Sequence, residues 1–132
     1  MIAADTNLLV RAVVVDDAVQ AGKVRRLLEE SMAAGEEVFV SHIALCELCW
    51  VLEKIYQFNR TDVGEAMAGL LADDCYVFQD RAAVEMALAD CQKIPAQFAD
   101  HLLGAVARRA GCTTTFTFDR VAAQSPNFTL LK

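Results

Sequence analysis

The chain has 132 residues, of which 55% are hydrophobic and 23% charged, and its formal net charge is −6. This size and balance predict a single folded domain over residues 1–132 and exclude a disordered chain. The chain is acidic, whereas nucleic-acid-binding proteins are usually basic. A polynucleotide function is therefore disfavoured unless a cation is added to the protein.

Neither a membrane span nor a disulfide framework is expected. The longest mainly apolar run, residues 43–52, is too short to cross a bilayer and is interrupted by Glu47. The N-terminal sequence MIAADTNLL lacks the basic segment and apolar core of a signal peptide, so we expect a cytoplasmic protein. Five cysteines are an odd number, which favours reduced thiols.

In chain order, short apolar runs alternate with longer helical patterns. The expected strands are residues 1–4, 37–40, 75–78, 113–118 and about 128–131. The expected helices run from a cap at Asp16 or Asp17 to about 34, from Ser41 to about 56, from Thr61 to about 72, from Asp80 to about 93, and from about 97 to 110 before Gly111. This alternation predicts an α/β fold with a parallel sheet covered on both faces.

Two acids follow predicted strands directly. Asp5 begins the segment Asp5-Thr6-Asn7, which is typical of a turn into a short helix, and Asp119 comes after TTTFTF. In open α/β sheets the functional site lies beyond the carboxyl ends of the strands. Each acid alone is equally well explained as a helix or turn cap.

Two further acids lie in apolar helical segments. Glu47 is the sole charged residue of residues 43–52, and its neighbours one turn away are apolar, which is costly for a carboxylate without a partner or a metal. Asp100 begins DHLLGAVA, where a first-turn acid also suits the helix dipole. Together, the four acids predict an all-oxygen cluster suited to Mg²⁺ or Mn²⁺, which activates water for attack on a phosphodiester.

The ordered motifs ADTNLL (4–9), Glu47, FADHLLGAVA (98–107) and TFDR (117–120) resemble those of PIN-domain nucleases. Within that group the chain resembles the VapC toxins of bacterial toxin–antitoxin pairs, over essentially its whole length. The resemblance implies a three-layer α/β/α fold with a central parallel sheet of four or five strands in the order 3-2-1-4-5. It also implies a Mg²⁺- or Mn²⁺-dependent endoribonuclease leaving 5′-phosphate and 3′-hydroxyl ends, a homodimer, and inhibition by a small antitoxin.

The same resemblance assigns roles to individual residues. Asp5, Glu47, Asp100 and Asp119 would bind the metal; Thr6 and Asn7 would support Asp5 and the attacking water, and Thr117 would supply a hydroxyl before the fourth acid. The family more often has bulkier aliphatic residues in the first strand and a small or apolar residue at His101, which we expect to be solvated. Arg11 and Arg120 lie near proposed acids in sequence and are candidate phosphate contacts, while a solvated surface role remains the alternative.

Several other patterns are better explained by packing. Cys46 and Cys49 lie mid-helix among apolar residues, and His42 and Cys49 would be about 10 Å apart along the axis, too far to share one zinc ion. Trp50, Tyr56 and Phe58 are expected in the core.

Three alternative functions were considered. A phosphatase with an aspartyl nucleophile would require an acid at the position of Asn7. An inactive PIN-like binding module and a housekeeping nuclease without an antitoxin remain open.

Overall fold

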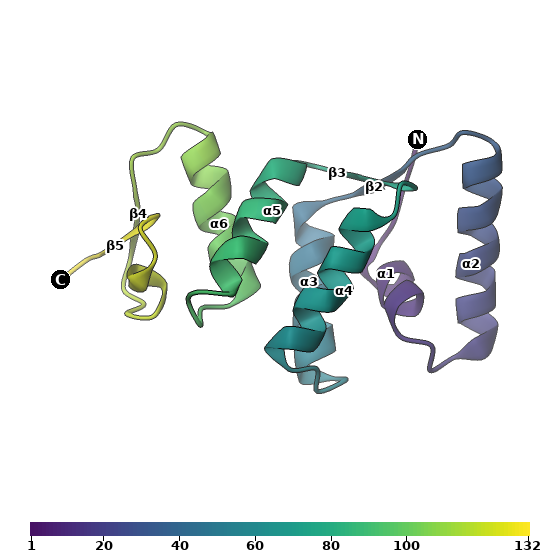
Figure 1. The fold of residues 1–132 in the computed structure, drawn as a ribbon, viewed down its shortest axis with the longest axis horizontal. Coiled ribbons are helices and arrows are strands. Elements are labelled where there is room, and N and C mark those ends of the chain that lie inside the picture. Colours follow the sequence, from purple (N-terminus) through teal and green to yellow (C-terminus); the bar gives the residue numbers. More distant parts are fainter. The chain divides into compact units, whose positions relative to one another are not determined.

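The computed structural model describes all 132 residues as six α-helices, one 3₁₀ helix and five short strands (Figure 1). In chain order they are β1 (Ile2–Ala3), α1 (Thr6–Val13), α2 (Ala18–Ala33), β2 (Val38–Val40), α3 (His42–Lys54), α4 (Arg60–Ala72), β3 (Tyr76–Phe78), α5 (Arg81–Cys91), α6 (Phe98–Arg109), β4 (Thr115–Thr117), the 3₁₀ helix η1 (Ala122–Gln124) and β5 (Phe128–Leu130). The α/β class is confirmed. None of the helices is both long and apolar enough to cross a membrane.

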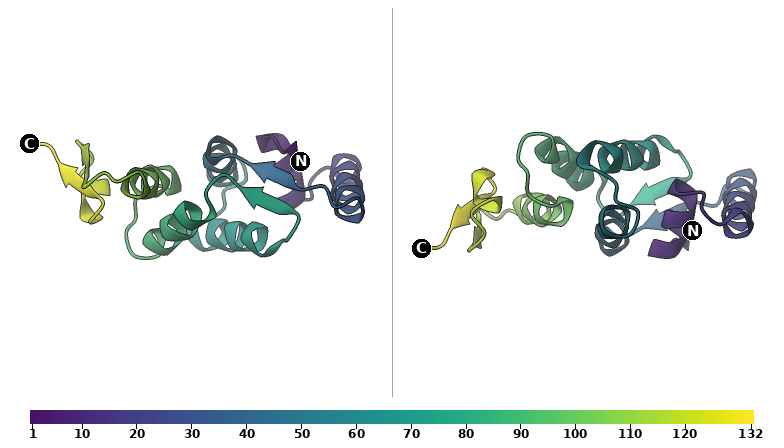
Figure 2. Two further views of the ribbon diagram at one scale, coloured as in Figure 1. Left: turned by 90° about the horizontal axis from the view of Figure 1, so that it is seen from above. Right: turned by 90° about the horizontal axis from the view of Figure 1, so that it is seen from below.

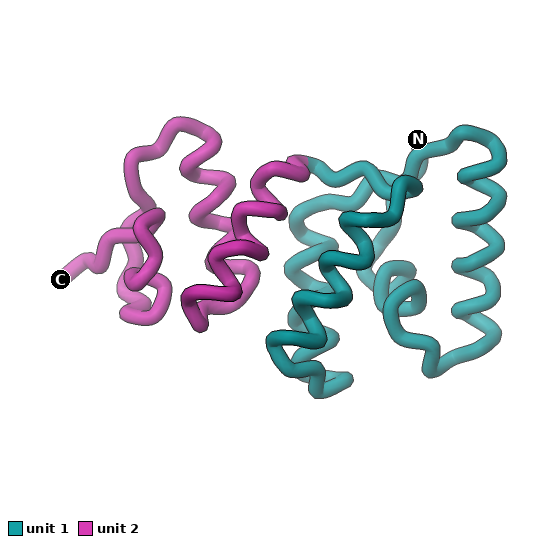
Figure 3. Tube along the Cα trace, viewed as in Figure 1, with its two compact units in different colours: residues 1–79 teal, residues 80–132 magenta.

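The chain divides into two compact units, residues 1–79 and 80–132 (Figure 3). The first unit holds a parallel sheet in the order β1-β2-β3, in which Ile2 pairs with Val38 and Val38 with Tyr76. Helices α1 and α3 lie on one face of this sheet and α4 on the other (Figure 2). The first unit is thus a small α/β/α sandwich, and the carboxyl ends of its strands share one edge.

The core of the first unit lies between the sheet and α3. Val38 and Val40 are fully buried and point inward from β2, while α3 contributes Leu45, Leu48 and Leu52, all fully buried. The apolar positions of α3 recur at three- and four-residue spacing, so that one helical face packs on the sheet. Burial of this face stabilises the unit because each buried leucine removes apolar surface from water.

The second unit packs α5 against α6 and adds a two-stranded parallel sheet, β4-β5. The backbone of α6 at Gly104 approaches the Phe128 ring of β5 so closely that a Cβ there would lie 2.6 Å from a ring carbon. Gly111 ends α6 with a φ of 97°, the left-handed conformation expected after a helix. Arg109 Nε donates to Asp80 Oδ2 at 2.6 Å and joins the end of α6 to the start of α5.

The predicted strand order is supported piecewise. Pairing of strand three with two, of two with one, and of four with five is observed, whereas the strands form two sheets and the pairing of one with four stays a prediction. The single-domain description likewise stays a prediction. The third long helix begins at Arg60, capped by Asn59 and not by Thr61, because Asn59 and Asp62 form a reciprocal capping box.

Candidate active site

Asp5 stands at the carboxyl end of β1 and caps α1. Its Oδ1 accepts a hydrogen bond from the Leu8 backbone N–H at 3.0 Å, whereas its Oδ2 accepts none. The side chain is exposed. The capping role and the proposed ligand role are compatible, because the cap fixes the direction of the carboxylate and leaves one oxygen available.

Glu47 is joined to the turn that follows Asp5. The Thr6 hydroxyl donates to Glu47 Oε2 at 2.7 Å, linking the first residue of α1 to the middle of α3. We expected Glu47 on a buried apolar stripe, and this is wrong: the side chain is exposed, and so are its neighbours Ile43 and Trp50. The helix buries its opposite face. Because apolar residues lie on both faces of α3, the apolar pattern alone does not predict which face is buried.

Asp119 is held in the turn after β4 by three backbone N–H bonds. Its Oδ1 accepts from Val121 at 2.8 Å and from Ala122 at 3.3 Å, and its own N–H donates to Thr117 Oγ1 at 3.0 Å. The hydroxyl of Thr117 therefore shapes the turn that carries the acid. Asp119 Oδ2 accepts no hydrogen bond and the side chain is exposed.

Asp100 is the first-turn acid of α6 and is half-buried. The next residue, His101, was expected in solvent, and this is wrong because it is only 1% exposed. Its Nε2 lies 3.0 Å from the Ile94 carbonyl oxygen, and its Nδ1 has no hydrogen-bond partner. His101 thus fastens the loop before α6, a helix whose N-cap residue, Gln97, makes no side-chain capping bond.

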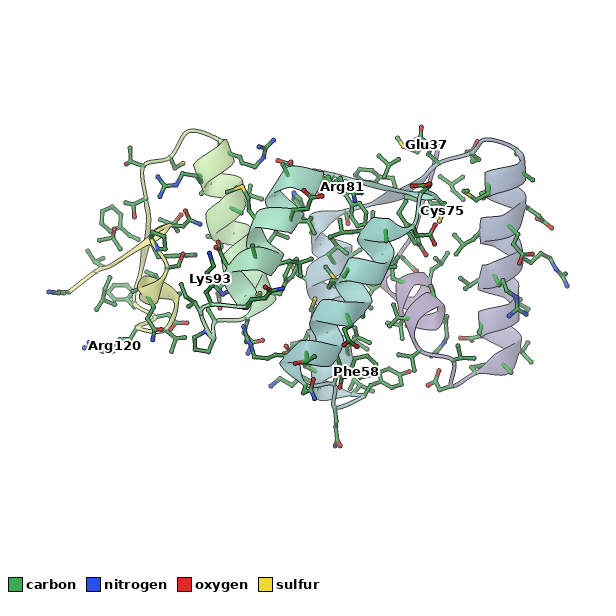
Figure 4. All side chains as sticks on the ribbon, in the orientation of Figure 1. Glu37, Phe58, Cys75, Arg81, Lys93 and Arg120 are labelled. Carbon is green, nitrogen blue, oxygen red and sulfur yellow. The ribbon has the colours of Figure 1, made fainter.

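The candidate phosphate-binding arginines differ in their surroundings. Arg120 is exposed beside η1, where Figure 4 labels it. Arg11 is already engaged: it donates to Asp16 at 2.8 Å, to the Tyr56 hydroxyl at 3.1 Å and to Gln20 at 2.6 Å. Its phosphate-binding role stays a prediction, and its observed role is to join α1, α2 and the end of α3.

The surroundings of Cys49 and Cys75 favour a packing role for these two residues. All five cysteines are free thiols, and Cys49 is buried in the core of the first unit. Cys75 is also buried, and desolvation raises the pKa of its thiol to about 12. A thiol with that pKa is protonated and unreactive at neutral pH.

Three of the four proposed acids have an oxygen that is available to a hard divalent cation. Asp5, Glu47 and Asp119 each have one oxygen held by the protein and one without a hydrogen bond. Oxygen ligands of this kind are those that Mg²⁺ and Mn²⁺ prefer. Within neither unit do three or more His, Cys, Asp or Glu side chains by themselves form a metal-binding group.

Comparison with known proteins decides the family. The sequence model of the PIN domain family matches residues 2–125 of the chain. The chain belongs to the PIN-domain family. This PIN domain is also 26% identical over 97 residues to a VapC ribonuclease of Aquifex aeolicus (strain VF5), a match covering 74% of this chain and 72% of the relative.

Two features of this PIN domain were not predicted from its sequence. A cleft of about 740 Å³ in the first unit is lined by α1, α2, α4 and β3, with Val13, Val24, Leu28 and Leu70 among its apolar residues. Trp50, expected in the core, is 57% exposed. The cleft is formed by three helices that are far apart in the sequence, so no local pattern predicts it. The exposure of Trp50 could have been predicted, because Trp50 lies on the same face of the helix as Glu47.

Proposed function

We propose that this PIN domain is a Mg²⁺- or Mn²⁺-dependent endoribonuclease and the toxin of a type II toxin–antitoxin pair. The observation that carries the proposal is the state of Asp5, Glu47 and Asp119, each oriented through one oxygen with the other unengaged. Its similarity to a VapC ribonuclease supports RNA as the substrate. We propose Asp5, Glu47, Asp100 and Asp119 as the metal ligands.

Each supporting residue has a distinct task in this proposal. Thr6 donates to Glu47 Oε2 and so fixes the direction of the carboxylate, while the other oxygen stays without a hydrogen bond. Thr117 stabilises the turn of Asp119 through the Asp119 N–H. Asn7 is exposed in the first turn of α1 and, with Thr6, is proposed to orient the attacking water.

The reaction is hydrolysis at phosphorus. A bound divalent cation would supply activation of water and compensation of the charge that builds up on the phosphate. The water oxygen forms the new bond to phosphorus and the bond to the 3′ oxygen breaks, which leaves a 5′-phosphate and a 3′-hydroxyl. The cation also supplies the positive charge that a chain of net charge −6 lacks.

We propose that the antitoxin binds in the cleft of the first unit. The lining of the cleft is mainly apolar and also includes Arg11, Arg25, Glu29 and Glu65. A partner segment with one apolar face and charges of both signs suits such a surface. The cleft is lined by Arg11, Ala12 and Val13 at the end of α1, the helix that Asp5 caps at its start. By the same family resemblance we propose a homodimer acting in the cytoplasm.

The test is cleavage of a labelled RNA by the purified chain. We expect cleavage with Mg²⁺ or Mn²⁺, none with EDTA, and loss of at least about a hundredfold in rate for Asp5→Asn, in line with removal of an electrostatic catalytic group. The control is Asp74→Asn, because Asp74 is exposed and makes no hydrogen bond. Cleavage that persists in Asp5→Asn would contradict the assignment, and Mn²⁺ binding without turnover of any RNA would favour an inactive binding module.

A further inference from the structure

Helix α3 carries one exposed row of side chains that includes Glu47. Ile43, Glu47, Trp50 and Lys54 follow each other at spacings of four, three and four residues, and all are exposed. Such spacing places side chains on one helical face. At 1.5 Å per residue, Trp50 lies about 4.5 Å along the axis from Glu47, and Lys54 about 6 Å further.

The face of α3 that carries this row is exposed, whereas the opposite face is buried. Ile43 is 73% exposed and Trp50 57%, whereas Leu48 and Cys49 on the opposite face are 0% and 4% exposed. Tryptophan is on average a highly buried residue, so an exposed indole beside a functional carboxylate marks a candidate binding surface.

We propose that Trp50 stacks on a base of single-stranded nucleic acid bound across this row, and that Lys54 contacts a phosphate of the same strand. The proposal rests on the proposed function for the role of Glu47 beside the scissile phosphate. An indole ring accepts any base, because every base has a π-face. The surface therefore selects unpaired bases and is tolerant of their sequence.

A nucleobase fits this face better than a flat protein surface does. A flat protein surface that covers both Ile43 and Trp50 would also cover Glu47, which lies between them in the row, and would have to supply a cation to pair with its carboxylate. A stacked base needs only the indole ring. It leaves the Glu47 carboxylate open to water and to a cation.

Stacking supplies affinity that the net charge of the chain does not. Most single-strand binders combine a positively charged groove with stacking, but this chain has 18 acidic and 12 basic residues. Stacking on Trp50 contributes affinity without requiring positive charge. Lys54, exposed at the end of α3, supplies one local cation in the same row.

The sequence contains a single tryptophan, so fluorescence excited at wavelengths that tyrosine does not absorb reports on Trp50 alone. The intact chain is titrated in EDTA, where no cleavage is expected, with a short oligoadenylate and with a matched abasic oligonucleotide. We expect saturable quenching by the oligoadenylate and little by the abasic strand. Quenching that does not depend on the bases would overturn the proposal.

Variants test the same surface through binding of a labelled oligoadenylate. Trp50→Ala is expected to weaken binding roughly tenfold, within the range for one stacked base, and Trp50→Phe to retain most of the affinity. Lys54→Gln should reduce the slope of log affinity against log salt by about 0.7. Val19→Ala is the control, because Val19 is a 69% exposed aliphatic residue on α2.

The outcomes separate this inference from the proposed function. If the chain cleaves RNA with the same KM in wild type and Trp50→Ala, the stacking surface is wrong and the ribonuclease stands. If base-dependent quenching occurs but no RNA is cleaved, the ribonuclease fails and the surface stands. A change of oligomeric state in Trp50→Ala, measured by light scattering, would show a protein partner on this face and would also overturn the proposal.

Discussion

At the scale of single residues, the structure changes the interpretation of the Glu47 carboxylate. The sequence indicated a costly acid on an apolar helix, whereas the structure gives an exposed acid fixed by the Thr6 hydroxyl. Exposure removes the desolvation cost that first made Glu47 conspicuous. What remains is its hydrogen bond to the residue next to Asp5, which a solvated surface acid would not need.

Replacement of Glu47 by Gln tests this position. We expect RNA cleavage to fall at least about a hundredfold, because the amide keeps the shape of the side chain but loses the negative charge that a metal requires. The melting temperature should change little, since the group is exposed. Cleavage rate and thermal unfolding are measured together with Glu53→Gln on the same helix, which should keep full activity. A Glu47→Gln protein that cleaves normally would remove Glu47 from the site.

At the scale of elements, the contact between α6 and β5 depends on Gly104. A Cβ at this position would lie 2.6 Å and 3.0 Å from two carbons of the Phe128 ring and 3.2 Å from Asn127 Cβ. Arg108 reinforces the contact by donating to Asn127 Oδ1 and to the Pro126 carbonyl, both at 3.1 Å. The glycine therefore sets how closely the helix that carries Asp100 approaches the second sheet.

Gly104→Ala should destabilise the protein by about 1–3 kcal/mol, the usual cost of overpacking, even though alanine is the better helix former. Urea unfolding measures the change. Gly64→Ala is the matched control, because Gly64 lies in α4 with no atom within 4 Å of the added Cβ, and it should be neutral or stabilising. If both variants behave alike, the close approach of Phe128 does not matter for stability.

A second element-level contact joins α1, α2 and α3. The Tyr56 hydroxyl donates to Asp16 Oδ2 at 2.7 Å, and Arg11 forms an ion pair with the same carboxylate at 2.8 Å. The hydrogen bond from Tyr56, with the Arg11 charge as a further cause, lowers the pKa of Asp16 below its ordinary value of 3.8. The folded protein thus favours the ionised carboxylate.

This lowered pKa has a defined sign for stability. An acid whose pKa is lower in the folded state stabilises the fold above its unfolded pKa, and this stabilisation is lost as the pH falls through the folded value. The difference in unfolding free energy between wild type and Asp16→Asn should therefore shrink as the pH is lowered below the ordinary pKa of Asp16. Urea unfolding over an acidic pH series measures it, with Asp74→Asn as the control. A difference that is constant with pH would contradict the proposed cause.

At the scale of the whole molecule, net charge and family membership seemed to disagree. A chain with charge −6 is a poor partner for RNA, yet it belongs to the PIN-domain family over residues 2–125. A divalent cation at the acids and stacking on the uncharged indole of Trp50 would together reconcile the two. Both replace the basic groove that the chain lacks.

Expression of the chain alone in a bacterium should arrest growth, because the proposed toxin activity would degrade cellular RNA. Co-expression with its small antitoxin, expected from a short reading frame directly upstream of the gene, should restore growth. Growth curves and RNA integrity are the measurements, with Asp5→Asn as the inactive control. Arrest that persists in Asp5→Asn would have another cause, and absence of arrest in the active chain would favour a housekeeping nuclease.

The sequence alone predicted the order of the main helices and strands along the chain and pointed to four candidate acids, whose shared site stays a prediction. Strong local signals made this possible: Asp17, Ser41 and Asp80 cap helices as expected, and Gly111 follows α6 in a left-handed conformation. A boundary was missed at Asn59, where two caps of similar strength compete within three residues. Local rules suffice for such features because the interacting atoms are near in sequence.

Only the tertiary structure decided which faces of the helices are buried. Trp50 and Glu47 turned out exposed and His101 buried, although composition and position suggested the reverse. The Thr6–Glu47 bond spans 41 residues, and the cleft needs α1, α2 and α4 together, so no local pattern could reveal either. Burial depends on which elements pack against each other, and that packing is set by contacts between residues far apart in the chain.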